Sequence, residues 1–233
     1  MKYKIKYFLF PLSMLVMFMI TCSCKKDDDN PIILHGPNVT DIDGNVYHSV
    51  IIRSQTWMIE NLNVTHYRNG DSMPNVTDRT EWRNFKQGAY CNFNNTVSNS
   101  TTYGKLYNWY AVNDIRNIAP TGWHIPSNEE WTTLITLLGG ETVAGGKLKE
   151  SGYTHWAAPN TGATNSSGFT ALPAGSRTYD GSFLGIGGVG AWWSSTENDS
   201  INAYYLGVSY DGSIGNDGNL KSVGCSVRCL KDN

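Results

Sequence analysis

The sequence lacks the short signatures of several common enzyme classes, and it lacks the charge of a nucleic-acid-binding protein. Its 233 residues contain no HExxH, GxSxG or Walker pattern, so they predict no zincin, serine-hydrolase or P-loop site. Lys and Arg number 18 against 20 Asp and Glu, and three of the 18 lie in residues 1–7, which we expect to be removed. The mature chain is therefore acidic and has no basic stripe, so no nucleic-acid partner is expected.

A long apolar run is also missing, because the most apolar segment, residues 8–20, is too short for a comfortable transmembrane span. A basic stretch precedes this segment and small residues end it, which is typical of a signal peptide. The run ends in Thr-Cys-Ser-Cys, which resembles a lipobox, where a cysteine is acylated after cleavage. We expect residues 1–23 to be a lipoprotein signal peptide and Cys24 to be lipidated, because the small Ser23 precedes it. Lipidation of Cys22 and an unlipidated secretion signal are the alternatives.

Residues 24–38 are expected to form an acidic tether between the anchor and the folded domain. They begin with CKKDDDN, and a charge run of this kind is solvated and unstructured by default. The cluster resembles the lipoprotein export signal of Bacteroidetes, in which Lys and Asp follow the lipidated Cys. This resemblance implies an outer-membrane lipoprotein on the cell surface, held to the membrane by its lipid. Retention on the periplasmic face is the alternative.

Cysteines are few in the predicted globular domain, residues 39–233, which contains only Cys91, Cys225 and Cys229. An exported protein can form disulfides. Cys225 and Cys229 are four residues apart in a predicted strand, so their Cα atoms would lie about 13 Å apart, too far for a bond. A disulfide would therefore join Cys91 to one of them, and the pair Cys91–Cys229 is our candidate. Buried free thiols are the alternative.

Glycine and aromatic residues are abundant, at 24 Gly, 8 Trp, 13 Tyr and 7 Phe. This composition favours an α+β fold with few helices, short antiparallel strands, long ordered loops and an aromatic core. A hairpin is expected over residues 39–52, with Asp43 and Gly44 at its turn. Further strands are expected over residues 204–210 and 225–229, where apolar residues alternate.

Two segments have helical spacing, residues 103–115 and the segment that begins at Ser127. The second is the clearer, because Glu130 follows Ser127 by three residues and completes a capping box. Gly139 follows the predicted helix and ends it. Its apolar residues recur at i, i+3, i+4 and i+7, as one buried face would require. They are Trp131, Leu134, Ile135 and Leu138.

Seven motifs in one order identify a family resemblance. They are DGNVY at 43–47, QTWMIENL at 55–62, YGKLYNW at 103–109, PTGWHIPSNEEW at 120–131, SGFTALPAG at 167–175, WSSTE at 193–197 and SVRC at 226–229. Together they resemble the Fibrobacter succinogenes major paralogous domain (FISUMP) family over nearly the whole mature domain. The family is similar, more distantly, to formylglycine-generating enzymes and C-type lectins, which implies a C-type-lectin-like α+β domain. It implies no activity, and a fold by itself does not carry chemistry.

Patterns that suggest chemistry have simpler structural interpretations. Residues 185–190 satisfy GxGxxG, but no strand precedes them and no helix follows, so we interpret them as a flexible loop. Glu129 and Glu130 lie in the first turn of a helix, where acidic groups favour the helix dipole. His124 has no His or Cys partner at ligand spacing, so we expect a hydrogen-bonded structural role and no transition-metal site.

The expected ligand-binding face combines residues 177–183 with residues 193–199, two stretches that join aromatic and polar side chains. Its candidate side chains are Arg177, Tyr179, Asp180, Trp193, Glu197, Asn198 and Asp199. Oxygen ligands at 197–199 also allow calcium, although their spacing does not reproduce the usual lectin motif, and no other cofactor is expected.

The expected function is non-enzymatic: a surface lipoprotein whose lectin-like scaffold binds a glycan or a protein, or mediates adhesion. A structural envelope protein is the alternative. An oxidase related to formylglycine-generating enzymes is less favoured, because Cys229 lies in the closing SVRC motif, downstream of that family's reactive cysteine pair. O-glycosylation is expected at Ser72 and Ser200, since DSM at 71–73 and DSI at 199–201 resemble the Bacteroidetes acceptor pattern. A chance match of three residues is the alternative there.

Overall fold

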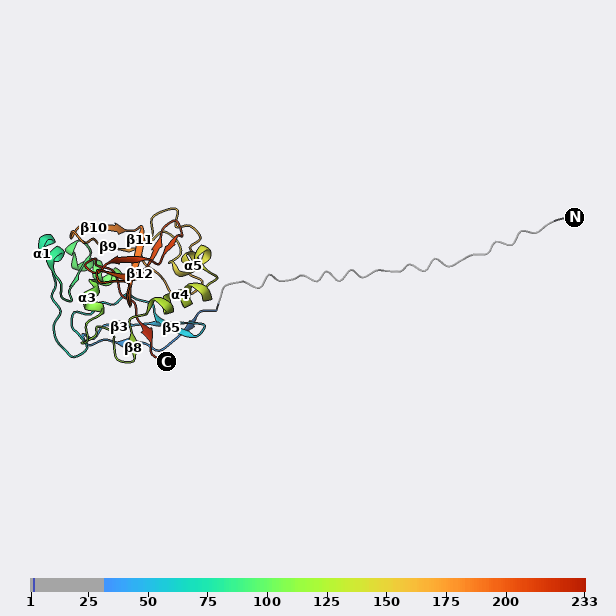
Figure 1. Ribbon diagram of the computed structural model, residues 1–233. Coiled ribbons are helices and arrows are strands. Elements are labelled where there is room, and N and C mark those ends of the chain that lie inside the picture. Colours follow the sequence, from blue (N-terminus) through green and yellow to red (C-terminus); the bar gives the residue numbers. More distant parts are fainter. Residues whose placement is uncertain (1, 3–31) are drawn as a thin grey trace. The chain divides into compact units, whose positions relative to one another are not determined.

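The two ends of the folded chain meet in one five-stranded antiparallel sheet. Its strands are, in order, β1 (Leu34–His35), β4 (Ser49–Ile52), β5 (Gln55–Met58), β15 (Leu230–Lys231) and β8 (Trp123–His124). The computed structural model of the chain describes Lys2 and residues 32–233, which Figure 1 traces from blue to red. Apart from Lys2, the predicted signal peptide lies outside the described residues, as do both candidate lipidation sites and the charged start of the tether.

The folded unit begins before residue 39, the predicted start of the domain. Leu34 of β1 lies opposite Ile51 of β4, so β1 extends the sheet at its edge. Ile33 also packs closely on Gly168, because a Cβ at Gly168 would lie 2.6 Å from the Ile33 Cγ2 atom. Residues 32–38, which we expected in the tether, therefore belong to the fold.

The hairpin predicted over residues 39–52 is confirmed for residues 39–47, whereas Ser49–Ile52 forms β4 of the five-stranded sheet. Strands β2 (Val39–Thr40) and β3 (Val46–Tyr47) pair antiparallel. Gly44 at the turn has a φ of 85°, which favours glycine. The Asp41 carboxylate fixes the turn, since it accepts hydrogen bonds from the backbone N–H groups of Asp43 and Asn45, both at 2.9 Å.

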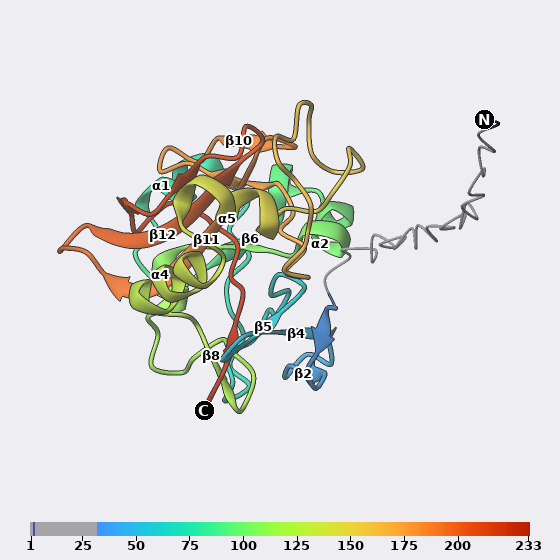
Figure 2. The same cartoon turned by 90° about the vertical axis from the view of Figure 1, so that its right-hand side faces the viewer.

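A larger sheet forms the second half of the domain. Its path is β10 (Phe183–Ile186), β9 (Ala174–Arg177), β11 (Val189–Glu197), β12 (Asn202–Ser209) and β13 (Ile214–Gly215), and β14 (Gly218–Leu220) also pairs with β12. Only β9 and β11 run parallel. A separate short pair joins β6 (Tyr90–Cys91) to β7 (Leu106–Tyr107). Figure 2 shows the β11–β12 pair beside helices α4 and α5, on the side of the domain away from β4.

The helices are few and short, which confirms the α+β class. They are α1 (Arg79–Asn84), α2 (Val97–Tyr103), α3 (Trp109–Val112), α4 (Asn128–Leu137) and α5 (Glu141–Leu148), with one 3₁₀ turn at Phe93–Asn95. Among the described residues no helix is long and apolar enough to cross a membrane. The single helix predicted over 103–115 is wrong: Gly104 ends α2 with a φ of 72°, and β7 separates α2 from α3.

Helix α4 is confirmed with its capping box. The Ser127 hydroxyl accepts from the Glu130 backbone N–H at 3.2 Å, and a Glu130 carboxylate oxygen accepts from the Ser127 backbone N–H at 2.8 Å. Trp131 is completely buried and stacks on Trp57 of β5 with ring centroids 4.5 Å apart. The Trp131 indole N–H also donates to the Trp193 carbonyl of β11. Trp131 therefore connects the two sheets.

Helix α5 was not predicted, because its Gly145 and Gly146 are weak helix formers. Both glycines are needed for a close approach. A Cβ at Gly145 would lie 2.5 Å from the Gly212 carbonyl oxygen, and one at Gly146 would lie 2.2 Å from that of Gly162. Tertiary packing therefore decides this helix against its local propensity.

The segment 225–229 does not form the predicted strand, because only Cys225 and Ser226 make isolated bridges, but it is buried on both of its faces. Cys225, Val227 and Cys229 point into one apolar cluster, as their alternation predicts. The alternate residues Ser226 and Arg228 are also 0% exposed. The Arg228 guanidinium donates to Asn61 Oδ1 from Nε at 3.1 Å and from a terminal nitrogen at 2.9 Å, and it also donates to the Phe169 carbonyl. Burial lowers the pKa of Arg228 to about 9, which leaves it charged at neutral pH.

Substitutions at the start of α4 and on its buried face should distinguish how much the N-cap and the buried face each contribute to the free energy of unfolding. Ser127→Ala should lower the free energy of unfolding by about 1 kcal/mol through loss of the cap, and Trp131→Ala by about 3–5 kcal/mol through the cavity it leaves. Thr133→Ala on the exposed face of the same helix is the matched control and should change little. Urea unfolding measures all three, and equal midpoints for wild type and Trp131→Ala would contradict the buried face.

Candidate functional site

Two residues of the predicted ligand-binding face are buried in the structure. Trp193 is 0% exposed, and its indole N–H donates to the Tyr107 carbonyl at 2.8 Å. Arg177 is also 0% exposed, and its guanidinium stacks on Trp82, 4.4 Å from the ring centroid. The structure corrects the prediction for both, because these side chains pack inside the domain and present no surface to a ligand.

The other five predicted side chains lie on two separate turns. Tyr179 and Asp180 belong to the β9–β10 turn, where the Asp180 carboxylate accepts from Ser182 and Thr178 and pairs with Arg79. The hydrogen bonds from Ser182 and Thr178 hold the pKa of Asp180 well below its usual range. Glu197, Asn198 and Asp199 are exposed at the end of β11 and in the turn that follows it. Among the described residues no hydrogen bond or ion pair joins the two turns, so they do not form one site.

The carboxylates proposed for calcium already have protein partners. Glu197 pairs with Lys221, which also donates to the Ser200 carbonyl at 2.9 Å. Asp199 accepts from the Asn202 side chain and from backbone N–H groups in its own turn, which lowers the pKa of Asp199. Within residues 32–233 no three His, Cys, Asp or Glu side chains are grouped as a metal site would require. These contacts describe an ordered turn and give calcium no support.

The three cysteines are buried free thiols in the structure. The expected pair Cys91–Cys229 is not formed, and the strand pairing gives the reason. Cys91 in β6 pairs with Leu106 of β7, and the next residue, Tyr107, pairs with Cys225 on the other side. A whole strand therefore separates Cys91 from the C-terminal segment, about 10 Å, too far for a disulfide. Burial raises the pKa of the Cys91 thiol to about 12. Burial also raises the pKa of the Cys225 and Cys229 thiols, so none of the three is a ready nucleophile.

The GxGxxG segment at 185–190 is strand and turn. It includes the end of β10 and the start of β11, and the Gly188 N–H donates to the Gly185 carbonyl at 2.9 Å between them. No helix follows, as expected, so the segment offers no helix N-terminus to a dinucleotide phosphate. The turn is hydrogen-bonded on both sides and is not the flexible loop that we predicted.

His124 joins two carboxylates in a hydrogen-bonded group of titratable side chains. Its Nε2 lies 2.9 Å from Glu130 Oε1, and its Nδ1 lies 2.6 Å from Asp232 Oδ1. Burial disfavours the charged imidazole, but the hydrogen bonds to Asp232 and Glu130 outweigh it and raise the pKa of His124. Glu130 also completes the capping box of α4 with Ser127. The network therefore connects Asp232, near the C-terminus, to the start of the helix. This confirms the structural interpretation of Glu130 and His124.

A cluster of three loops carries exposed aromatic side chains. The loop at 150–165, the turn at 187–188 and the turn at 210–213, which we call the three-loop cluster, are joined by backbone hydrogen bonds. The Tyr210 N–H donates to the Gly188 carbonyl at 2.8 Å, and the Thr161 N–H donates to the Tyr210 carbonyl at 2.8 Å. Tyr153 and Tyr210 are 67% and 41% exposed on this cluster.

A buried lysine fixes the three-loop cluster from below. Lys149 is 0% exposed, and its ammonium donates to the carbonyls of Thr161, Ser209 and Tyr210 at 3.0–3.2 Å. It also lies 5.3 Å from the centroid of the Trp156 ring. Because one cation binds two of the loops, their relative positions are set before any ligand arrives.

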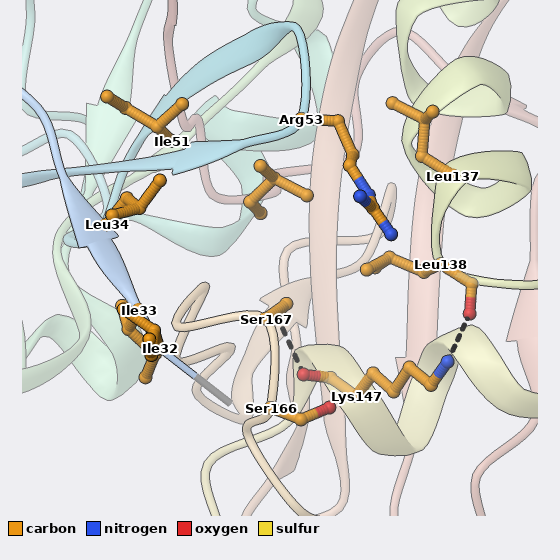
Figure 3. A pocket seen from close by; sticks show the side chains of 11 residues that line it. Ile32, Ile33, Leu34, Ile51, Arg53, Leu137, Leu138, Lys147, Ser166 and Ser167 are labelled. Carbon is orange, nitrogen blue, oxygen red and sulfur yellow. Dashed lines mark hydrogen bonds between the residues drawn. The ribbon is translucent and has the colours of Figure 1, made fainter. Parts of the chain in front are cut away.

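An apolar groove of about 530 Å³ lies at the start of the folded unit (Figure 3). It is lined by residues of β1, the β4–β5 hairpin and the end of α4, and Ile32 and Leu34 on its rim are 89% and 57% exposed. Of the residues that the structure describes, Arg53 and Lys147 are the only charged ones that line it, and no described Asp or Glu does so. Sequence reasoning missed the groove because residues 32–34 were assigned to the tether.

The two predicted O-glycosylation sites differ in how they present the acceptor pattern. Ser72 is exposed, but the following Met73 is only 4% exposed and packs in a core cluster. Ser200 is exposed, and the following Ile201 is 61% exposed. Modification stays a prediction, and in the folded domain the three-residue pattern is accessible at Ser200 only.

A family model described as the Fibrobacter succinogenes major domain matches residues 50–231 of the chain. The protein belongs to this family. The match covers most of the described domain and six of the seven motifs, and it confirms the resemblance to the family. No curated protein and no solved structure gives a significant match.

The family motifs map to buried contacts. Asn61 of the second motif accepts from the Trp192 indole at 2.7 Å and from Arg228 of the last motif. Phe169 of the fifth motif lies under the Arg228 guanidinium, 4.2 Å from it. The motifs of the Fibrobacter succinogenes major domain therefore mark the framework of this chain, while Tyr153 and Tyr210 lie outside them.

The raised pKa of His124 predicts a pH-dependent stability. The charged imidazole contributes below the unfolded-state pKa of about 6.5, and this contribution is lost as pH rises through the raised folded-state pKa. His124→Gln should therefore lower the urea midpoint more at a pH of about 6 than at a pH of about 9. His48→Gln, which removes an exposed histidine from another part of the domain, is the control. A His124→Gln effect of equal size at both pH values would contradict the charged network.

Proposed function

We propose that this protein is a lipid-anchored ligand-binding protein of the outer membrane, displayed on the cell surface, and not an enzyme. Its C-type-lectin-like scaffold holds the three-loop cluster, through which it binds a glycan. The observation that carries the proposal is that Tyr153 and Tyr210 stand exposed on loops that Lys149 holds in place. Tyrosines on rigid loops offer large contact area with little entropy to lose on binding.

Several features favour binding over catalysis. The thiols that an oxidase would need are buried, and burial raises their pKa. The titratable group around His124 serves the start of a helix and holds Asp232 near the C-terminus, so its hydrogen bonds are already used. The remaining exposed surface of the three-loop cluster is aromatic and polar, which suits recognition of a hydroxylated ligand.

A structural role in the envelope is the second candidate. It is favoured by the buried contacts that residues of the motifs make, such as Arg228 with Asn61 and Phe169. A spacer domain would also need such contacts to stay folded. The two candidates differ in one respect: a spacer domain needs no exposed tyrosines on loops that are fixed in advance.

The binding proposal is tested with a soluble, unlipidated form of the full mature chain on a glycan array. Tyr153→Ala or Tyr210→Ala should each reduce affinity for a bound glycan by about tenfold, as loss of an aromatic contact at a binding centre does. Tyr179→Ala, which removes an exposed tyrosine of intermediate accessibility from the β9–β10 turn, is the matched control and should bind like wild type. Loss of binding in EDTA would reveal calcium dependence.

Two outcomes would decide against this site. Binding that is lost in Tyr179→Ala and kept in the other two variants would move the site to the β9–β10 turn. Failure to bind any glycan, while the domain remains folded by circular dichroism, would favour a protein partner or the structural role.

The anchor is tested separately through Cys24. The wild-type chain should partition into detergent from its native envelope, and Cys24→Ala should leave it in the aqueous phase because the acylated thiol is lost. Cys22→Ala is the matched control and should partition like wild type. Detergent partitioning that is lost in Cys22→Ala and kept in Cys24→Ala would place the lipid on Cys22.

A further inference from the structure

We propose that the apolar groove between β1, the β4–β5 hairpin and α4 docks the domain onto the anionic surface of the lipid bilayer. This goes beyond glycan binding, because it assigns a second surface of the domain to a second partner. It rests on the proposed lipidation of Cys24. The occupant is inferred from the lining of the groove and from the length of chain that precedes it.

The lining fits the headgroup region of a membrane. Seven of the eleven lining residues are Ile or Leu, and the rim residues Ile32 and Leu34 expose most of their apolar surface. An exposed apolar patch of this kind marks a protein or membrane contact. Figure 3 shows these side chains facing one opening from two sides, β1 and the β4–β5 hairpin on one and the end of α4 on the other. Apolar side chains at such a rim can enter the boundary between headgroups and acyl chains.

The positive charges of Arg53 and Lys147 favour an anionic lipid surface. Arg53 extends from the β4–β5 turn over the groove, as Figure 3 shows, and it has no hydrogen-bond or ion-pair partner among residues 32–233. Lys147 donates one hydrogen bond to the Leu138 carbonyl at 2.9 Å, which leaves two ammonium protons. Among residues 32–233 no carboxylate lines the groove to compete, so both cations are available to phosphate groups.

The position in the chain brings this groove to the membrane. Ile32 follows Cys24 by eight residues, which reach at most about 28 Å when fully extended. A lipid on Cys24 therefore limits how far the rim residue Ile32 can move from the bilayer. Figure 2 shows the β11–β12 hairpin on the far side of the domain from β4, so docking through the groove leaves that hairpin away from the lipid.

Fluorescence quenching from lipid-borne nitroxides tests the docking. The full lipidated chain carries a bimane label at Ser166→Cys, in the groove, or at Ser200→Cys, in the β11–β12 turn. The native thiols are buried and should not react. In phosphatidylcholine vesicles that contain phosphatidylglycerol, the Ser166 label should be quenched several times more than the Ser200 label. Co-flotation of both proteins with the vesicles shows that anchoring itself has succeeded.

A charge reversal tests the contact with headgroups. Arg53→Glu should weaken docking by about fivefold or more, the effect of losing one cation near an anionic surface, and added salt should weaken docking in the wild type. Arg83→Glu, an exposed arginine in α1, is the matched control and should leave quenching unchanged. Equal quenching of the two labels in anchored protein would overturn docking. Quenching that Arg53→Glu leaves unchanged would overturn the headgroup contact. Neither outcome bears on glycan binding by Tyr153 and Tyr210.

Discussion

Buried cations that donate to loop carbonyls hold this domain together. Arg177, Arg228 and Lys149 are each 0% exposed, and none of the three forms an ion pair among the described residues. Instead each donates to several backbone carbonyls and lies against an aromatic ring. Burying a charge is unfavourable unless hydrogen bonds replace its water, and several charge-assisted bonds per cation meet that condition. The long loops in turn gain partners for carbonyls that no strand or helix satisfies.

This constraint explains how a fold with so little regular structure can present a defined surface. Arg177 binds the carbonyls of Thr77 and Asp78, about 100 residues earlier in the chain, and so fixes the entry to α1. Lys149 does the same for the loops that carry Tyr153 and Tyr210. Loops held in this way lose little freedom on binding, which is the condition for affinity from a small contact area.

The sequence predicts the structural features whose determinants are residues close together in the chain. The capping box at Ser127 and the turn at Gly44 are confirmed because their determinants lie within a few residues. The ligand-binding face at Arg177 and Trp193 fails because orientation in a sheet depends on distant partners. Nothing local shows that Arg177 stacks on Trp82, or that Trp193 bonds to Tyr107. The groove and the three-loop cluster are likewise assembled from segments more than 100 and about 50 residues apart, respectively, and no local pattern predicts either.

The same division separates the buried framework from the exposed loops. Asn61, Phe169 and Arg228 lie within residues 50–231, which match the Fibrobacter succinogenes major domain, in motifs that resemble the family, and Arg228 donates to both of the others in the interior. Tyr153, Tyr210 and Arg53 lie outside those motifs and are exposed. A framework fixed by buried cations tolerates changes in the loops it holds, since the bonds run to backbone carbonyls, which every residue has. Loop side chains can therefore change while the interior that positions them stays the same.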